Sequence, residues 1–187
     1  MVSEGQISIW RRRPERVLKP DPNLLVDVVA PKVLDAWKAA SAALARAGVR
    51  HVVIDGLAVG ANGHPRATKD VDFLVGEEAF HHHAGGLVTM NPAIPIAVNG
   101  VAIDYLAPRP DEAHLAAALA APPGTFIDAA RLVYMKLRAS RMQDRADVVA
   151  LVKTGLDVDA CRAYLSTNPP ALVAMFDDLV AKAISEQ

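Results

Sequence analysis

The 187-residue sequence has a single cysteine, Cys161, which excludes an internal disulfide bond. So little cysteine use fits a reducing compartment, and we expect a cytoplasmic protein. No apolar run approaches the ~20 residues that a membrane-spanning helix needs. The first residues have no basic segment followed by a long apolar one, so we expect no secretory signal.

The sequence also lacks an excess of charge. Its formal net charge is −1, which gives no general argument for nucleic-acid or membrane binding. Hydrophobic residues make up 52% of the chain, too many for a disordered protein. One basic cluster stands near the amino terminus, and it is either a solvated arm or a phosphate-binding arm for a nucleic acid. Its members are Arg11, Arg12, Arg13, Arg16 and Lys19.

Strand patterns come early in the chain and helix patterns come late. The predicted strands cover 51–54 and 70–75, with 87–90 as a candidate strand, and a hairpin of 94–98 and 101–106 joined by Asn99-Gly100. The predicted helices cover 31–48, 57–62, 111–120, 126–139, 144–153, 157–166 and 169–185. We therefore expect an α/β (α+β) fold, with a mixed sheet flanked by helices and a helical carboxy-terminal part. The expected parts are an irregular arm (1–31), a core (32–108) and a helical region packed on it (109–187).

Three carboxylates on predicted strands indicate a metal site. Asp70 and Asp72 are two residues apart, so on one strand they share a face. Two neighbouring carboxylates on a core strand are costly unless a cation joins them. Asp104 lies within a later strand and completes the set if the two strands are neighbours. Two carboxylates can bridge two metals roughly 3.5–4 Å apart, and a third can ligate one metal and accept a proton.

Basic and small residues near these acids are candidates for phosphate binding. Arg66 in the loop before Asp70 is suited to phosphate oxygens, although a solvated loop arginine is nearly as good an interpretation. Thr68 either caps the turn or donates to a phosphate. Lys136 shares a helix face with apolar residues, so it reaches either into a cleft or to an ion pair with Asp147. The run of His81, His82 and His83 predicts a surface loop.

The run DGLAVGANGHPRATKDVDFLV resembles the core of the nucleotidyltransferase superfamily related to DNA polymerase β, in particular prokaryotic AbiEii-like toxins and minimal nucleotidyltransferases. Their pattern is Gly-Gly or Gly-Ser after the first strand, a G-x-P-R-x-T loop, D-x-D on the second strand and a later third Asp. The stretch LVYMKLRASRMQDRADVVALV resembles their helical segment. The matching positions in the first run and the later strand are Gly56, Ala58, Gly63, Pro65, Arg66, Thr68, Asp70, Asp72 and Asp104.

The resemblance implies a metal-dependent transfer of a nucleotide from a nucleoside triphosphate, such as ATP, to a hydroxyl on an RNA end or a protein. It implies Mg²⁺ or Mn²⁺ held by Asp70, Asp72 and Asp104, which are also the catalytic residues. It implies nucleotide binding by Gly56, Arg66, Thr68 and Lys136, and it allows a toxin-like role with an antitoxin-like partner. The alternative is a degenerate member that binds a nucleotide or a partner without catalysis.

Asp55 departs from the family pattern, because it stands where the first glycine is expected. A carboxylate ~6 Å from a phosphate charge costs about 2–3 kcal/mol at an effective dielectric near 20. The hypothesis of repulsion predicts that Asp55 weakens triphosphate binding. The alternatives are that Asp55 ligates a metal or pairs with Arg66. In another register of the resemblance, Gly56 is the first glycine of the pattern and Leu57 takes the second place.

Overall fold

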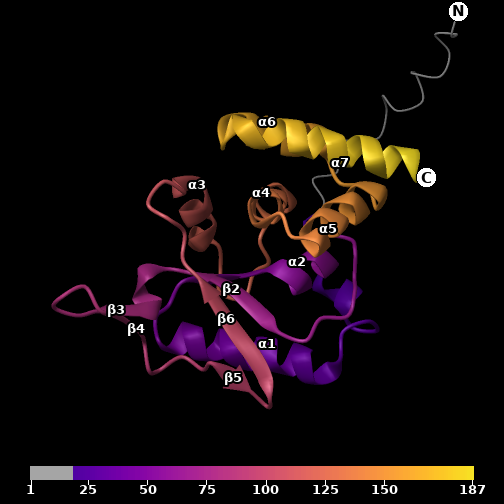
Figure 1. Ribbon diagram of the computed structural model, residues 1–187. Helices are drawn as coiled ribbons and strands as arrows, with labels where there is room; N and C mark the ends of the chain where they lie inside the picture. The colour runs from indigo at the N-terminus through magenta and orange to yellow at the C-terminus, as the bar shows by residue number, and fades with distance from the viewer. Residues whose placement is uncertain (1–18) are drawn as a thin grey trace, which may run out of the picture.

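The computed structural model describes residues 19–187, and its elements follow the order strand, short helix, strand, hairpins and then helices (Figure 1). The expected basic arm lies outside these residues, apart from Lys19. The strands are β1 (His51–Ile54), β2 (Val71–Val75), β3 (Phe80–His82), β4 (Val88–Met90), β5 (Ala97–Val98) and β6 (Val101–Leu106). The α-helices are α1 (Pro31–Arg46), α2 (Asp55–Ala61), α3 (Ala113–Ala116), α4 (Ala129–Ala139), α5 (Met142–Lys153), α6 (Val158–Thr167) and α7 (Val173–Ser185). Short 3₁₀ turns are η2 (Pro22–Leu25), η3 (Glu77–Ala79), η4 (Ala117–Ala120) and η5 (Pro170–Leu172).

The main sheet has the strand order β1-β2-β6-β5 and is mixed. β1 runs antiparallel to β2, β2 runs parallel to β6, and β6 runs antiparallel to β5. The β5–β6 turn is made by Asn99 and Gly100, both with positive φ (50° and 74°), as the Asn-Gly pair predicts. β3 and β4 form a separate two-stranded hairpin. The mixed sheet and the helical carboxy-terminal half confirm the predicted fold class.

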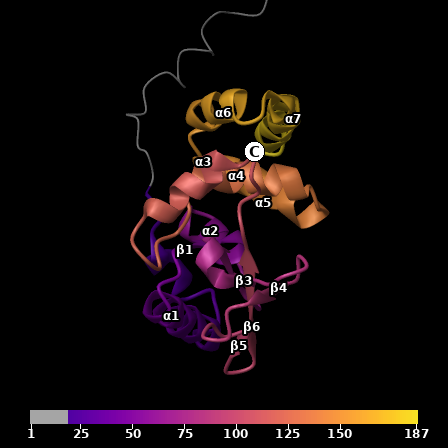
Figure 2. The same ribbon diagram turned by 90° about the vertical axis from the view of Figure 1, so that its left-hand side faces the viewer.

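Helix α1 covers one side of the sheet, and the later helices form two further layers. Pro31 opens α1, and the apolar side chains of Val33, Ala36, Ala40 and Leu44 recur at helical spacing and are buried. α1 contacts β1, β2, β5 and β6. Figures 1 and 2 show α2, α4 and α5 between the sheet and an outer layer made of α6 and α7. Within residues 19–187, none of the helices combines the length and the apolar character that crossing a membrane requires.

Several local predictions differ from the structure. The strand predicted at 94–98 is reduced to Ala97–Val98, and the helix predicted at 111–120 is the short α3 followed by the 3₁₀ turn η4. Helix α5 starts two residues earlier than predicted, and α7 starts four residues later, after η5. Helix α4 starts at Ala129 rather than 126, because Phe126 forms a parallel bridge with Val53 and the chain there follows β1. The predicted surface loop is wrong in part, because His81 and His82 belong to β3, although their side chains are exposed. Helix α2 begins at Asp55, two residues early, directly at the end of β1.

Candidate functional site

Asp70, Asp72 and Asp104, here called the acidic trio, lie at the centre of the main sheet. Asp72 is the register partner of Asp104 across the parallel β2–β6 pair, so the two side chains share a face of the sheet. β2 begins at Val71, one residue later than predicted, and Asp70 lies in the bend before it. Its carboxylate accepts a hydrogen bond of 3.0 Å from Thr68 Oγ1. The fold therefore brings Asp72 and Asp104 together and leaves Asp70 at the mouth of the strand.

The acidic trio differs electrostatically from the buried carboxylates Asp144 and Asp147. Within the described part of the chain, no lysine, arginine or histidine nitrogen lies within 4.0 Å of a trio carboxylate. Burial, together with the negative charges of Asp55, Asp70 and Asp104, raises the pKa of Asp72 to about 7, although Lys136 opposes this rise. Hard oxygen ligands without an internal cation suit a divalent metal ion. The carboxylate oxygens of the three trio residues do not all lie within 4.8 Å of one another, so an ion bound by all three would require Asp70 to move toward Asp72 and Asp104.

A cleft of about 410 Å³ opens beside Asp72 and Asp104. Its walls come from the ends of β1, β2 and β6 and from helices α3, α4 and α5. The charged residues of its lining are Asp55, Asp72, Asp104, Arg109, Glu112, Lys136, Arg138, Arg141 and Asp144. Leu106, Leu115, Leu132, Met135, Tyr105 and Tyr134 supply an apolar and aromatic part. A cleft of this size, with convergent charges and apolar walls, is suited to a small charged ligand with an apolar or aromatic moiety.

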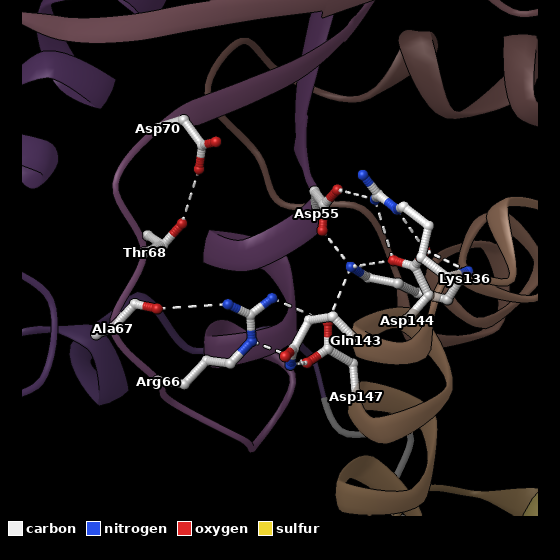
Figure 3. A network of polar contacts seen from close by, with 10 residues as sticks. Asp55, Arg66, Ala67, Thr68, Asp70, Lys136, Gln143, Asp144 and Asp147 are labelled. Carbon is white, nitrogen blue, oxygen red and sulfur yellow. Dashed lines mark hydrogen bonds and ion pairs between the residues drawn. The ribbon is translucent and has the colours of Figure 1, made fainter.

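A second group of charges, here called the ion-pair network, lies at one side of the cleft (Figure 3). It consists of Asp55, Arg66, Lys136, Arg141, Asp144 and Asp147. The Lys136 ammonium lies 3.0 Å from Asp144 Oδ1 and 2.9 Å from Asp147 Oδ2, and it also pairs with Asp55. Of the two alternatives for Lys136, the ion pair with Asp147 is therefore present. Burial lowers the pKa of Lys136, but hydrogen bonds and charges from Asp55 and Asp147 outweigh burial and raise it overall.

Arg66 points to the protein interior rather than to a free phosphate position. Its Nε and Nη2 donate to the two oxygens of Asp147 at 2.8 and 2.9 Å, a bidentate pair. Asp147 is fully buried and also accepts from Gln143 at 2.8 Å. Burial raises the pKa of Asp147, but the donors Arg66, Lys136 and Gln143 outweigh it and lower the pKa below its usual value. Arg66 thus ties the loop before β2 to α5.

Asp55 is also part of the network. Its Oδ1 accepts from Lys136, and its Oδ2 accepts from Arg141 Nη2 at 3.2 Å. The charge of Asp55 is therefore compensated by two cations, and Arg66, one of the alternatives, is not among them. Its backbone has φ of 49°, a left-handed conformation that glycine adopts freely and that aspartate tolerates better than most residues. This backbone conformation gives a physical reason for a glycine at this position in the family pattern.

Asp55, Asp144 and Asp147 form a group that could hold a metal ion, since their carboxylate oxygens lie within 4.8 Å of one another. In the described residues this is the one such group of three. The Lys136 ammonium contacts all three carboxylates, so a positive charge already lies among them. A divalent ion there would have to displace a buried lysine. The acidic trio has no such competitor in the described chain.

Gly56 is needed for packing. A Cβ at this position would lie 2.7 Å from Thr68 Oγ1 and 3.2 Å from Thr68 Cβ. The loop that carries Thr68 and Asp70 can therefore approach α2 only because residue 56 has no side chain. Neither Gly56 nor Thr68 lines the large cleft.

Two charged residues that line the cleft, Arg109 and Glu112, were not predicted as site residues. Arg109 follows β6, and within residues 19–187 its guanidinium has no ion pair. Glu112 is buried, accepts from the Arg109 amide at 2.8 Å and from the Tyr134 hydroxyl at 2.7 Å, and pairs with Arg138. The available signal is an arginine three residues after the strand that carries Asp104.

Comparisons with known proteins find little. No family model matches the sequence, and no curated protein matches it. Among solved structures, the chain is similar to an antigenic nucleotidyltransferase-like protein from Paracoccidioides brasiliensis, with a TM-score of 0.40 and 14% identity. The match covers 79% of this chain and 95% of that one. At this TM-score the likeness carries no argument, so the proposed function depends on the site geometry.

Proposed function

We propose that the protein is a metal-dependent nucleotidyltransferase, which transfers a nucleotide from a nucleoside triphosphate to a hydroxyl. The observation that carries the proposal is the register pairing of Asp72 and Asp104, with Asp70 in the bend before β2 and no internal cation within ion-pair distance in residues 19–187. This order of a D-x-D on the second strand and a third aspartate on the neighbouring strand is what the family resemblance implies. The adjoining cleft has the size and the mixed lining that a nucleotide requires.

The residues of the chain have separate roles in this proposal. Asp70, Asp72 and Asp104 would hold Mg²⁺ or Mn²⁺, which when bound neutralises phosphate charge. Asp104 is exposed to the cleft and accepts the proton of the attacking hydroxyl. Arg109, Lys136 and Arg141 line the cleft and bind phosphate oxygens, and the apolar wall of the cleft takes the nucleobase. The acceptor is an RNA end or a protein side chain, and a toxin-like role with an antitoxin-like partner follows from the resemblance alone.

The test is transfer of label from each α-labelled nucleoside triphosphate to total RNA or protein in the presence of Mg²⁺ or Mn²⁺. We expect Asp104→Asn to lower the rate by at least about 100-fold, because loss of a proton acceptor commonly costs this much. Asp111→Asn is the matched control, because this exposed carboxylate is seven residues away and does not line the cleft. Equal rates for the two variants would refute the proposed role of Asp104.

A second candidate is a non-catalytic nucleotide-binding protein of the same fold. It is favoured by the engagement of Lys136 and Arg66 in internal ion pairs rather than toward the cleft. In that case a triphosphate binds in calorimetry, but no label is transferred with either metal.

A further inference from the structure

The carboxylate of Asp55 has the arrangement that a bound phosphate group would have. One oxygen accepts from Lys136 Nζ and the other accepts from Arg141 Nη2, so two oxygens of one anion bridge two cations. Arginine and lysine bind phosphate oxygens through the same charge-assisted hydrogen bonds. Asp55, Lys136 and Arg141 all line the large cleft, so this position is reached from the cleft.

Of the three carboxylates around Lys136, Asp55 is the one that a ligand can replace. The side chain of Asp55 is 30% exposed, whereas those of Asp144 and Asp147 are 1% and 0% exposed. Asp144 and Asp147 come from α5, where their other partners, Arg141 and Arg66, hold them in place. Asp55 comes from the β1–α2 junction and has no other cation within ion-pair distance among residues 19–187.

The charge of the network depends on Asp55. The network contains three carboxylates (Asp55, Asp144, Asp147) and three cations (Arg66, Lys136, Arg141), so it is neutral as a whole. Without the Asp55 charge, the network has one positive charge in excess at the cleft. Because Lys136 is buried, that excess charge attracts an anion more strongly than an exposed lysine would.

The backbone supports a specific role for Asp55. A non-glycine residue with a φ of 49° costs conformational energy, and such positions persist where surrounding contacts hold them. The side-chain contacts of Asp55 are the ion pairs to Lys136 and Arg141.

We propose that Asp55 is a specificity-determining residue that occupies the phosphate position of the cleft and competes, as an internal carboxylate, with a polyphosphate for Lys136 and Arg141. This inference deepens the proposed function. It rests on the proposed function in one respect, because that function identifies the polyphosphate as the triphosphate of a nucleotide. Asp55 acts by occupying these two cations, and a polyphosphate binds at this position by replacing its carboxylate.

The test uses inorganic tripolyphosphate in EDTA, so that neither metal, nucleobase nor acceptor is involved. Calorimetry compares the wild type, Asp55→Asn, and Glu186→Gln as the matched control, because Glu186 pairs with Lys153 on an exposed surface. We expect Asp55→Asn to bind tripolyphosphate on the order of tenfold tighter or more, because the ligand no longer has to break charge-assisted hydrogen bonds between Asp55 and the two cations. Glu186→Gln is expected to bind like the wild type. In the Asp55→Asn background, Arg141→Gln should remove most of the gain.

Tripolyphosphate binding by Asp55→Asn that is no tighter than that of the wild type would overturn the inference, as would a gain that survives Arg141→Gln. Asp55→Gly provides a second variant, since glycine adopts the positive φ without strain, and the same gain is expected. The proposed function is tested separately by metal-dependent transfer. Tighter tripolyphosphate binding without any transfer would refute the enzyme and leave the phosphate position in place, and transfer without tighter binding would refute only the role of Asp55.

Discussion

Replacement of Asp147 by asparagine tests whether the ion-pair network holds the loop before β2 against the helices. Asp147 is fully buried and receives four hydrogen bonds or ion pairs of 2.8–2.9 Å, from Arg66, Lys136 and Gln143. An asparagine has nearly the same volume but no charge, so in the variant less negative charge balances the positive charges of Arg66 and Lys136. Breaking a buried ion pair by removal of one partner costs about 3–5 kcal/mol.

We expect the free energy of unfolding to fall by about 3 kcal/mol, the lower end of that range, because Arg66 is 25% exposed and regains water and Lys136 keeps Asp55 and Asp144. For a chain of this length this corresponds to a fall in Tm of about 6–12 °C. Urea denaturation followed by far-ultraviolet circular dichroism measures the free energy, and a thermal scan measures Tm.

The matched control is Asp159→Asn, which removes the same charge from a side chain that is 97% exposed and pairs with Arg162 at 3.0 Å. Its expected effect is below about 0.5 kcal/mol. If Asp147→Asn destabilises the protein no more than Asp159→Asn, then the buried network contributes nothing measurable, and the reasoning from its geometry is wrong.

Three further predictions concern pH, metal and packing. Because the pKa of Asp72 is raised to about 7, its contribution to stability is fully present below about pH 4 and is lost as the pH rises to about 7. In metal-free buffer the Tm of Asp72→Asn should therefore exceed that of the wild type by an amount that grows from pH 4.5 to 8. At pH 8, Mg²⁺ should raise the Tm of the wild type but not that of the variant. A Tm difference between the two proteins that does not change with pH would argue against the raised pKa. The pKa values of Asp144 and Asp147 are lowered, so their contribution to folding stability is present above about pH 4 and is lost as the pH falls further. The Tm measured as the pH is lowered below 4 should therefore fall less in Asp147→Asn than in the wild type. Gly56→Ala should destabilise by about 1–3 kcal/mol through the clash with Thr68, measured by urea denaturation, and Thr68→Ala in the same chain should recover part of it; no recovery would mean that the clash lies elsewhere.

Local patterns in the sequence determined much of the framework. The apolar β-branched run 52–54 predicts β1, and Asn99-Gly100 between two apolar runs predicts the β5–β6 hairpin. The helical spacing that begins at Pro31 predicts α1 within two residues. These predictions succeed because turn geometry and burial periodicity are set by residues close together in the chain. The prediction for 126–128 failed because the pairing of Phe126 with Val53, a distant strand, overrides local helical preference.

The sequence by itself also determined which residue types form the site, since the spacing of Asp70 and Asp72 and the position of Asp104 predict a set of carboxylates on strands. Only the tertiary structure decided the partners of the charges. Lys136 is 81 residues from Asp55, and Arg141 is 86 residues from it, yet both contact its carboxylate. Whether Asp55 repels a phosphate, binds a metal or pairs with a cation depends on where α4 and α5 pack against α2. That packing results from apolar burial over the whole chain, so no local pattern around Asp55 predicts it.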